Sequence, residues 1–360
     1  MEKNILLKER LHKLREFLET KGYDGVMFSA YENRRYFSFF TGSNGYLIIT
    51  KNKYILITDK RYTTQAQQQT IGCEILEHAA DRYELIAKTI RSLGVKSVLV
   101  EAGIPVGEFF ALKDKLPELK YSYEEESFLE MRMVKDDYEI ACTKDAIGCA
   151  ERSFDKLLPK LKIGMTEKDL ADELHYLALK EGADDLSFSI IAASGARGAL
   201  AHGVPTDKVI EDGDMVVVDF GVMKNGYCSD MTRTLLFGNI DAKKQHIFDL
   251  VAKSQKAAFE AIRPGVLAKE VEEAHREVFR RENLEEYALK GLGHGIGLQI
   301  HECPRIVIGN ETRLVPNMIF TLEPGLYFPG KYGVRTEDDV LVTESSCENL
   351  SHTPHEIHIR

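Results

Sequence analysis

The hydrophobic positions in the first third of the chain alternate between helical and extended spacing. Apolar residues from Leu6 to Leu18 recur at helical intervals and Gly22 follows as a stop signal, which predicts an N-terminal helix. Lys51-Asn52-Lys53 has the composition of a hairpin tip. The expected strands are 25–28, 46–49, 54–58 and 95–100, and the expected helices are 63–69, 83–93 and 109–116. This alternation is typical of an α/β module.

In the rest of the chain, a helical pattern followed by an extended pattern occurs twice. Thr166-Glu167-Lys168-Asp169 opens one of the helices as a capping-box-like start, with Asp in place of the usual Glu. Pro264-Gly265 separates two others. The expected helices are 136–158, 167–180, 242–262 and 267–281, while strand patterns dominate 186–237 and then run on to Val342.

A change of pattern near residue 130 indicates a domain boundary. The acidic stretch Tyr123–Glu126 and the following Met131–Lys135 have the character of a crossing between domains. We therefore expect two domains, residues 1–133 and 134–360, with the linker near 124–133. The length of 360 residues agrees with this division, because domains cluster near ~100–200 residues.

Charge and composition narrow the possible partners. The formal net charge is −10, and it is uneven, with +1 in residues 1–133 and −11 in residues 134–360. This balance argues against nucleic-acid binding and against an anionic membrane surface. No run approaches the ~18–20 apolar residues of a transmembrane helix, and Met1–Leu11 lacks a signal-peptide core. The six cysteines form no CxxC pair, so we expect reduced thiols and a soluble, cytoplasmic protein.

Two acidic residues lie on a predicted hairpin in the second domain. Asp219 ends the apolar run from Met215, and Asp230 begins the returning strand. If Asn225-Gly226 is the tip, Asp219 opposes Thr232, and Asp230 lies two residues back on the same face. Two carboxylates placed in this way can converge on one cation. The alternative interpretation is that Asp230 pairs with Arg233 and Asp219 only ends a strand.

A second strand pair repeats this arrangement. Glu323 ends the apolar run from Met318, and Glu337 lies on the strand that returns after Pro329-Gly330. The repetition hints at an internal duplication. Because burying isolated carboxylates is very costly, four of them on apolar strands favour a divalent cation with hard oxygen ligands, such as Mn²⁺.

Three histidines are candidates for the same site. His294 lies between glycines in Gly291–Gly297, which permits close approach of the backbone on both sides. This segment fails the dinucleotide-binding GxGxxG pattern. His301 begins a string that resembles HExxH, but Arg305 stands where the second histidine is required, which excludes a zincin. His202 lies in a short loop of small residues, and taken singly His202 and His301 are more often surface histidines than catalytic ones.

Together these residues resemble the metallopeptidases of the aminopeptidase P/prolidase group. The resemblance rests on five ordered residues with their strings VDFG, SDMTRT, GHGIG, EPG and RTED, and it covers essentially the whole chain. Thr41–Gly45 and Thr58–Tyr62 are similar to strings of the creatinase-type N-terminal domain. The implied fold is an α/β creatinase-type domain followed by an α+β pita-bread domain with a curved, mainly antiparallel sheet.

The resemblance also implies roles for these residues. Asp219 would bind one metal ion, Asp230 and Glu337 would bridge two, and His294 with Glu323 would complete the second. His202 and His301 would bind substrate and steady the tetrahedral intermediate. Arg305 matches an arginine of the dipeptidase branch that pairs with a substrate carboxylate, a role suited to a guanidinium. Two divalent ions are expected, with Mn²⁺ first and Co²⁺ or Zn²⁺ as alternatives.

The expected activity is metal-assisted hydrolysis of an N-terminal Xaa-Pro bond in short proline-containing peptides. Glu323 would accept the proton of the attacking water and pass it to the leaving nitrogen. Thr232 and Thr234 either brace Asp230 or are ordinary strand residues. Arg305 favours a prolidase that cleaves dipeptides. The alternatives are an aminopeptidase P acting on longer peptides and a non-catalytic binding protein that retains the fold. The resemblance also implies a homodimer.

Overall fold

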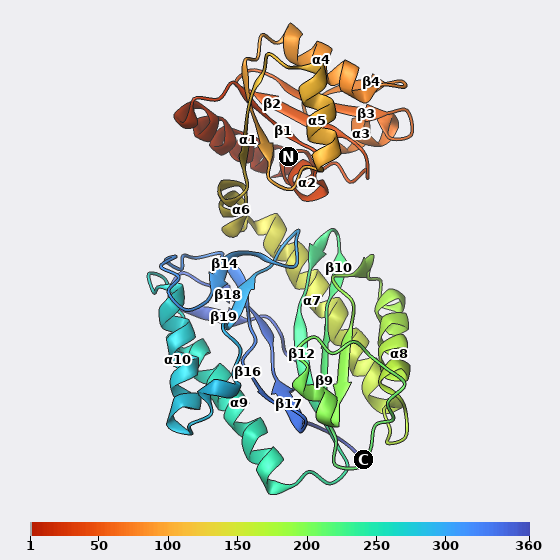
Figure 1. The fold of residues 1–360 in the computed structure, drawn as a ribbon, viewed down its shortest axis with the longest axis vertical. Helices are drawn as coiled ribbons and strands as arrows, with labels where there is room; N and C mark the ends of the chain where they lie inside the picture. The colour runs from red at the N-terminus through yellow and green to blue at the C-terminus, as the bar shows by residue number, and fades with distance from the viewer. Residues whose placement is uncertain (1) are drawn as a thin grey trace. The chain divides into compact units, whose positions relative to one another are not determined.

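The structure is a computed structural model, which describes residues 2–360. The chain divides into two compact units, Met1–Arg132 and Met133–Arg360, which are unit 1 and unit 2 below. Each unit has its own sheet or sheets, as Figure 1 shows, and its own hydrophobic core.

Unit 1 is built around one six-stranded mixed sheet with the order β4-β3-β2-β1-β5-β6. The pairs β1–β2 and β2–β3 are antiparallel, whereas β3–β4, β1–β5 and β5–β6 are parallel. The strands are β1 (Gly25–Phe28), β2 (Tyr46–Thr50), β3 (Tyr54–Asp59), β4 (Glu74–His78), β5 (Ser97–Glu101) and β6 (Lys120–Glu124).

Helices supply the apolar side chains that cover this sheet. On one face, Ile86 and Ile90 of α4 and Leu112 of α5 pack with strand residues such as Ile48 and Val98. An aromatic cluster of Phe17, Phe28, Phe37 and Phe128 joins β1 to α1, α2 and α6. The helices are α1 (Glu2–Lys21), α2 (Tyr31–Ser38), α3 (Thr63–Gln69), α4 (Arg82–Ser92), α5 (Val106–Lys115) and α6 (Glu126–Met133).

Unit 2 consists of two halves with the same order of elements. In the first half, α7 (Asp137–Leu157) and α8 (Glu167–Lys180) precede β7 (Asp185–Leu186), β8 (Ile191–Ser194), β9 (Met215–Phe220), β10 (Val222–Lys224), β11 (Tyr227–Cys228) and β12 (Met231–Phe237). In the second, α9 (Ala242–Ala261) and α10 (Ala268–Arg281) precede β13 (Gly293–Gly295), β14 (Glu302–Ile306), β15 (Ile319–Leu322), β16 (Gly325–Phe328), β17 (Tyr332–Arg335) and β18 (Asp338–Val342). The final strands are β19 (Cys347–Asn349) and β20 (Ile357–Ile359).

Each half contains a long antiparallel strand pair joined by a small hairpin. In the first half β9 pairs with β12, and in the second β15 pairs with β18. The connecting hairpins are β10–β11 and β16–β17. The helix pairs α7–α8 and α9–α10 lie on opposite sides of these strands in Figure 1. The carboxylates predicted to bind metal lie at corresponding ends of the two strand pairs.

Most elements agree with the pattern of the sequence. The helix over 167–180 has the predicted bounds, and its capping box is present, because Asp169 N–H donates to Thr166 Oγ1 and Thr166 N–H donates to Asp169 Oδ2. The hairpin tip at 51–53 is confirmed by the antiparallel pairing of β2 with β3. The sequence did not predict α2, β4, β6 or α6. Residues 124–133, expected as a linker, form the end of β6 and helix α6.

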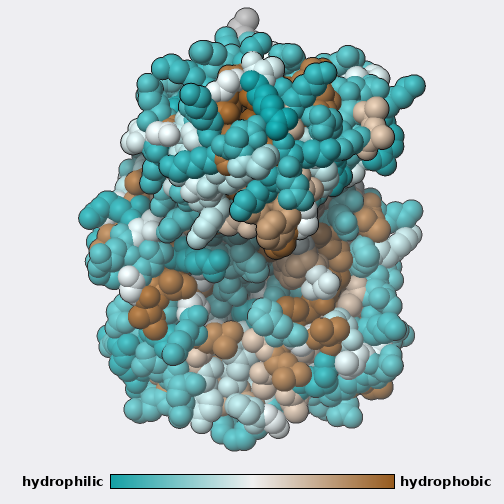
Figure 2. All heavy atoms as spheres, turned by 45° about the horizontal axis from the view of Figure 1, so that its top comes forward, coloured by the Kyte–Doolittle hydropathy of each residue, from teal (hydrophilic) through white to brown (hydrophobic). Residues whose placement is uncertain are grey.

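The surface is mixed in character. Figure 2 shows one face, which is mainly hydrophilic and carries its hydrophobic residues in separate patches. Within residues 2–360, no helix has both the length and the apolar composition needed to cross a membrane.

The core of the first half of unit 2 supports the strand that carries Asp219. Phe154 of α7 stacks on Phe220 of β9, with ring centroids 5.7 Å apart, and both side chains are fully buried. Because large-to-small changes in a core cost about 3–5 kcal/mol for Phe→Ala, Phe154→Ala should lower the free energy of unfolding by that amount in urea denaturation. Tyr176→Ala, which removes a half-exposed aromatic ring from α8, is the control and should cost less than about 1 kcal/mol. Equal losses in both variants would contradict this role of Phe154.

Candidate active site

A cavity of about 590 Å³ in unit 2 brings together all eight residues singled out from the sequence. They are His202, Asp219, Asp230, His294, His301, Arg305, Glu323 and Glu337. They come from segments that are far apart in the chain, and the two strand pairs place their acidic ends around the same space.

The first carboxylate pair has the predicted register. Asp219 on β9 lies opposite Thr232 on β12, and the turn at Asn225-Gly226 has positive φ at both residues, as a tight hairpin requires. Asp230 immediately precedes β12, where its N–H donates to Asp339 Oδ2 over 3.1 Å. Both Asp219 and Asp230 are buried.

The second carboxylate pair is fixed by main-chain hydrogen bonds at the ends of β15 and β18. Glu323 follows β15 and donates its N–H to the carbonyl oxygen of Leu292 over 2.7 Å. Glu337 precedes β18, and its N–H donates to the carbonyl oxygen of Thr232 over 3.1 Å. Its carboxylate also accepts a 2.6 Å hydrogen bond from Thr232 Oγ1, which links the second pair to the first.

His294 lies between the carboxylates because its neighbours have no side chains. A Cβ on Gly293 would lie 1.9 Å from the carbonyl oxygen of Thr321, and one on Gly295 would lie 2.1 Å from that of Cys303. His294 Nδ1 lies 3.1 Å from the carbonyl oxygen of Gly295, which can only accept, so Nδ1 carries the hydrogen. Nε2 then presents its lone pair to the carboxylates, as is usual for a metal-binding histidine.

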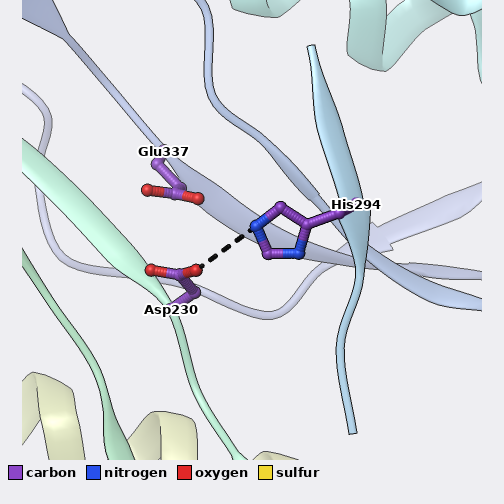
Figure 3. Close-up of side chains that lie close together, drawn as sticks. All are labelled: Asp230, His294 and Glu337. Carbon is purple, nitrogen blue, oxygen red and sulfur yellow. Dashed lines mark ion pairs between the residues drawn. The ribbon is translucent and has the colours of Figure 1, made fainter. Parts of the chain in front are cut away.

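Figure 3 shows the imidazole of His294 directed at the carboxylates of Asp230 and Glu337. Nε2 lies 3.6 Å from Asp230 Oδ2 and 3.5 Å from Glu323 Oε1. One ligand atom from each of Asp230, His294 and Glu337 lies within 4.8 Å of the other two. These separations suit side chains that share a cation.

Burial makes the carboxylates hard to ionise without a cation. It raises the pKa of Asp230 and Glu337 well above the ordinary values, and neighbouring carboxylates add to the effect. Burial also raises the pKa of Glu323 to about 7, although Arg335 opposes this shift. Burial lowers the pKa of His294 to about 4, which favours the neutral, metal-binding imidazole.

The donor set fits divalent metal ions. Asp219 Oδ1 and Asp230 Oδ1 are buried and have no hydrogen-bond partner among the described residues. Buried carboxylate oxygens without a partner are costly, and hard cations are the usual partners for oxygen donors. Only one buried guanidinium, that of Arg335, contacts this group of carboxylates in the described chain.

Arg335 is a site residue that the sequence interpretation missed. Its Nη2 donates to Asp219 Oδ2, its Nη1 to Tyr327 Oη over 2.7 Å, and its Nε to Thr232 Oγ1 over 3.1 Å. The guanidinium is 3% exposed. The available signal was a basic residue within the apolar strand β17, where an unpaired charge would be costly.

The contacts decide whether Thr232, Thr234 or Arg233 interacts with the carboxylate of Asp230. Thr232 contacts Glu337 rather than Asp230, and Thr234 Oγ1 donates to the carbonyl oxygen of Arg335 over 2.8 Å, so the bracing of Asp230 by either threonine was wrong. Arg233 Nη2 donates to Asp338 over 2.7 Å. The interpretation in which Arg233 pairs with Asp230 is therefore wrong as well.

His202, His301 and Arg305 are exposed side chains that line the cavity. The rings of His301 and His294 meet edge to face, with centroids 4.3 Å apart. Arg305 on β14 lies opposite His294 on β13. Burial lowers the pKa of His301, and the nearby charges of Arg305 and His202 lower it further.

A buried ion pair holds the strand that carries Arg305. Glu302, the residue after His301, forms a 2.6 Å ion pair with Lys135, and both side chains are fully buried. Glu302 Oε1 also accepts the N–H of Gln299 over 3.1 Å. Removing one partner of such a pair is strongly destabilising, so the pair fixes β14 relative to the start of unit 2.

Family models match both units. Residues 141–344 match the model of metallopeptidase family M24, and residues 10–134 match the creatinase/prolidase N-terminal domain. The chain belongs to metallopeptidase family M24. This membership and the pita-bread prolidases among its structural neighbours confirm the fold class expected from the sequence.

Similar proteins cover nearly the whole length of this M24 chain. It is 36% identical to "uncharacterized peptidase YqhT" of Bacillus subtilis, covering 97% of this chain and 99% of that protein. It is 32% identical to a Xaa-Pro dipeptidase of Pyrococcus horikoshii, covering 98% and 99% of the two chains.

Two solved structures resemble it equally in sequence. A Xaa-Pro dipeptidase from Bacillus anthracis is 36% identical with a TM-score of 0.95, covering 98% of this chain and 100% of that one. An X-Pro aminopeptidase from Thermotoga maritima is also 36% identical, with a TM-score of 0.90, covering 97% and 100%. Sequence identity therefore does not distinguish a preference for dipeptides from a preference for longer peptides.

The raised pKa of Glu323 should be visible in the stability of the metal-free protein. Its pKa of about 7 exceeds the ordinary 4.5, so its contribution to stability is complete below pH 4.5 and is lost as the pH rises through 7. The pKa of His294, lowered from 6.5 to about 4, acts in the opposite direction, mainly below pH 6.5 and weakly up to about pH 7.5. We expect the free energy of unfolding of chelator-treated protein to fall by roughly 0.5 kcal/mol between pH 6.5 and 8.

Urea denaturation at several pH values measures this effect. The pKa values of Asp230 and Glu337 are raised, like that of Glu323, so these two groups can only enlarge the fall in the free energy of unfolding. In Glu323→Gln the fall should be smaller by the share of this one carboxyl group. A free energy of unfolding that rises between pH 6.5 and 8 would contradict the account of the buried carboxylates.

Proposed function

We propose that this chain is a Xaa-Pro dipeptidase that uses two divalent metal ions, with Mn²⁺ as the first candidate. The observation that carries this proposal is one cavity with two features: buried carboxylate oxygens that have no hydrogen-bond partner among residues 2–360, and an exposed arginine on its wall. The carboxylate oxygens favour binding of cations, and the arginine can pair with the carboxylate of a short peptide.

Five side chains would hold the metal ions. Asp219 would bind one ion, Asp230 and Glu337 would bind both, and His294 with Glu323 would complete the second. When bound, the ions would supply Lewis acidity that activates water and polarises the scissile carbonyl group. Co²⁺ and Zn²⁺ are the alternative ions, because they accept the same oxygen and imidazole ligands.

The remaining chemistry belongs to the protein side chains. Glu323, whose side chain lines the cavity, would accept a proton from the attacking water and deliver it to the leaving prolyl nitrogen. His202 and His301, on the cavity wall, would donate hydrogen bonds to the developing oxyanion. A well-placed donor of this kind contributes about 3–4 kcal/mol to catalysis.

Arg305 and the apolar wall favour a dipeptide. The guanidinium would pair with the terminal carboxylate, which lies one residue after the scissile bond only in a dipeptide. Apolar side chains that line the cavity would contact the proline ring and the residue before it. They include Phe188, Ile190, Ile191, Val204 and Ile300.

Of two further candidate functions, one has support and the other does not. The X-Pro aminopeptidase from Thermotoga maritima and the string Thr58–Tyr62 favour an aminopeptidase P that accepts longer peptides. A non-catalytic binding protein would be expected to lose metal ligands, whereas every proposed ligand is present here. The homodimer and the cytoplasmic location expected from the sequence stay predictions.

Peptide hydrolysis after metal reconstitution tests the proposal. Chelator-treated protein supplied with Mn²⁺ should cleave Ala-Pro and Gly-Pro faster than Ala-Pro-Ala, and it should leave Ala-Ala intact. Chelator should abolish the activity and fresh Mn²⁺ restore it. Faster cleavage of Ala-Pro-Ala would establish the aminopeptidase alternative. No cleavage of any Xaa-Pro peptide would favour the non-catalytic binding protein.

Asp230→Ala tests the metal site. Loss of a residue that only orients a metal ligand typically costs about 10- to 100-fold in metal affinity, so loss of this central ligand should weaken Mn²⁺ binding by at least about 100-fold and abolish cleavage. The metal-free variant should remain folded, because it lacks a carboxylate whose burial is costly. Calorimetric titration with Mn²⁺ and thermal unfolding measure these effects, and Asp185→Ala on β7 is the exposed control. Full activity of the Asp230 variant would refute the metal model.

Arg305→Ala tests the proposed carboxylate anchor. A charge-assisted hydrogen bond is worth about 1.5–3 kcal/mol, so kcat/KM for Ala-Pro should fall about 10- to 100-fold. The fall should be much smaller for Ala-Pro-Ala and for Ala-Pro amide, because neither presents a carboxylate at the same place. An equal loss on all three substrates would remove Arg305 as the anchor.

A further inference from the structure

The loop that carries His202 begins and ends at one buried carboxylate. Residues 194–206 connect β8 to the stretch before β9, and Glu167, the first residue of α8, contacts both Ser194 and Thr206. Its side chain is fully buried, and it is not a wall residue of the active-site cavity. Because the desolvation of a carboxylate is costly, a buried carboxylate outside the cavity requires a structural explanation.

Each oxygen of Glu167 binds one end of the loop. Oε1 accepts hydrogen bonds from the N–H of Ser194 over 2.7 Å and from its hydroxyl over 2.9 Å. Oε2 accepts from the N–H of Thr206 over 3.1 Å and from its hydroxyl over 2.8 Å. Arg197 Nε adds a charged donor 3.0 Å from Oε2. The carboxylate thus closes a loop of about a dozen residues.

The middle of the loop is tied to the same network and to the site. Arg197, held by Glu167, donates from Nη2 to the carbonyl oxygen of Val204 over 2.6 Å. Arg335, which contacts Asp219, donates from Nη1 to the carbonyl oxygen of Ala201 over 2.9 Å. His202 lies between these two fixed carbonyl groups. Its backbone is therefore held from both sides, while its side chain is exposed to the cavity.

The donors outweigh the cost of burying the charge. Burial by itself would raise the pKa of Glu167, but the hydrogen bonds from Ser194, Thr206 and Arg197 lower it overall. Ordering a loop costs conformational entropy for every residue fixed, and charge-assisted hydrogen bonds are the stronger kind that can offset such a cost. The carboxylate is therefore ionised, and it contributes to the order of the loop.

We propose that Glu167 is a positioning residue, which holds the 194–206 loop so that His202 reaches the substrate in the cavity. The proposal rests on the proposed function, in which His202 binds substrate. The competing explanation is that Glu167 only stabilises the start of α8. That explanation predicts a loss of stability without any effect that depends on His202.

Glu167→Gln is the most direct test. A glutamine has the same shape, but one carboxylate oxygen becomes an NH₂ group, which can only donate. This group would face the donors of Ser194 or those of Thr206, so one end of the loop is released. Glu173→Gln on the same helix is the matched control, because it removes a carboxylate whose partner, Lys160, lies on the surface.

Hydrogen exchange of the metal-free protein gives a readout that needs no activity. In Glu167→Gln the amides of 195–206 should exchange at least about 10-fold faster than in the native protein, while those of β9 and β12 remain unchanged. Glu173→Gln should match the native protein throughout. Unchanged exchange of 195–206 in the Glu167 variant would overturn the proposal, whatever the enzyme proves to cleave.

Peptide cleavage then tests whether the loop acts through His202. In the Mn²⁺-loaded enzyme, Glu167→Gln should lower kcat/KM for Ala-Pro about 10- to 100-fold, because small misplacements of a contacting group have effects of this size. In a His202→Ala background the same change should have little further effect. Equal losses in both backgrounds would overturn the positioning role. Thr206→Val, which removes one hydroxyl donor, should give a smaller loss with the same dependence on His202, and it serves if Glu167→Gln does not fold.

Discussion

Mutual repulsion among buried carboxylates is the constraint on which the second unit depends. Asp219, Asp230, Glu323 and Glu337 line one cavity, and the guanidinium of Arg335 is the buried protein cation that contacts this group in the described chain. Like charges held this close cannot all ionise at neutral pH without further cations. The arrangement of carboxylates that destabilises the metal-free protein also makes the cavity a site for divalent metal ions. Burial is the main cause of the raised pKa values of Asp230, Glu323 and Glu337, and the neighbouring carboxylates raise them further.

The fold meets this constraint by repeating one device. In each half of unit 2, a long antiparallel strand pair places one carboxylate at the end of its first strand and another just before its second. Two hydrogen bonds between Thr232 and Glu337, one donated by each residue, join the two halves. Around this centre, buried charges fix other parts of the cavity wall. The Lys135–Glu302 pair anchors the strand of Arg305, and Glu167 closes the loop of His202.

Much of this could be predicted from the sequence, and the failures have physical reasons. The Asn225-Gly226 tip sets the register that brings Asp219 opposite Thr232, because a tight turn leaves no freedom in the pairing. Glycines beside His294 marked a close approach that the structure contains. Arg335 and Glu167 were missed because Asp219, which Arg335 contacts, and the 194–206 loop, which Glu167 binds, lie far away in the chain. A basic residue at the end of the apolar strand β17 was a local signal for Arg335, and Glu167 had no comparable one. Strands β4 and β6 were missed because edge strands can be half polar and still form.

The central claim is that the cavity of unit 2 holds metal ions through Asp219, Asp230, His294, Glu323 and Glu337. Anomalous diffraction from crystals grown with Mn²⁺ tests it most directly, because the signal locates the ion without any assumption about substrate. The account predicts two Mn²⁺ peaks per chain within this cavity, in contact with these five side chains. Crystals with Mn²⁺ elsewhere or with no peak among these residues would contradict it.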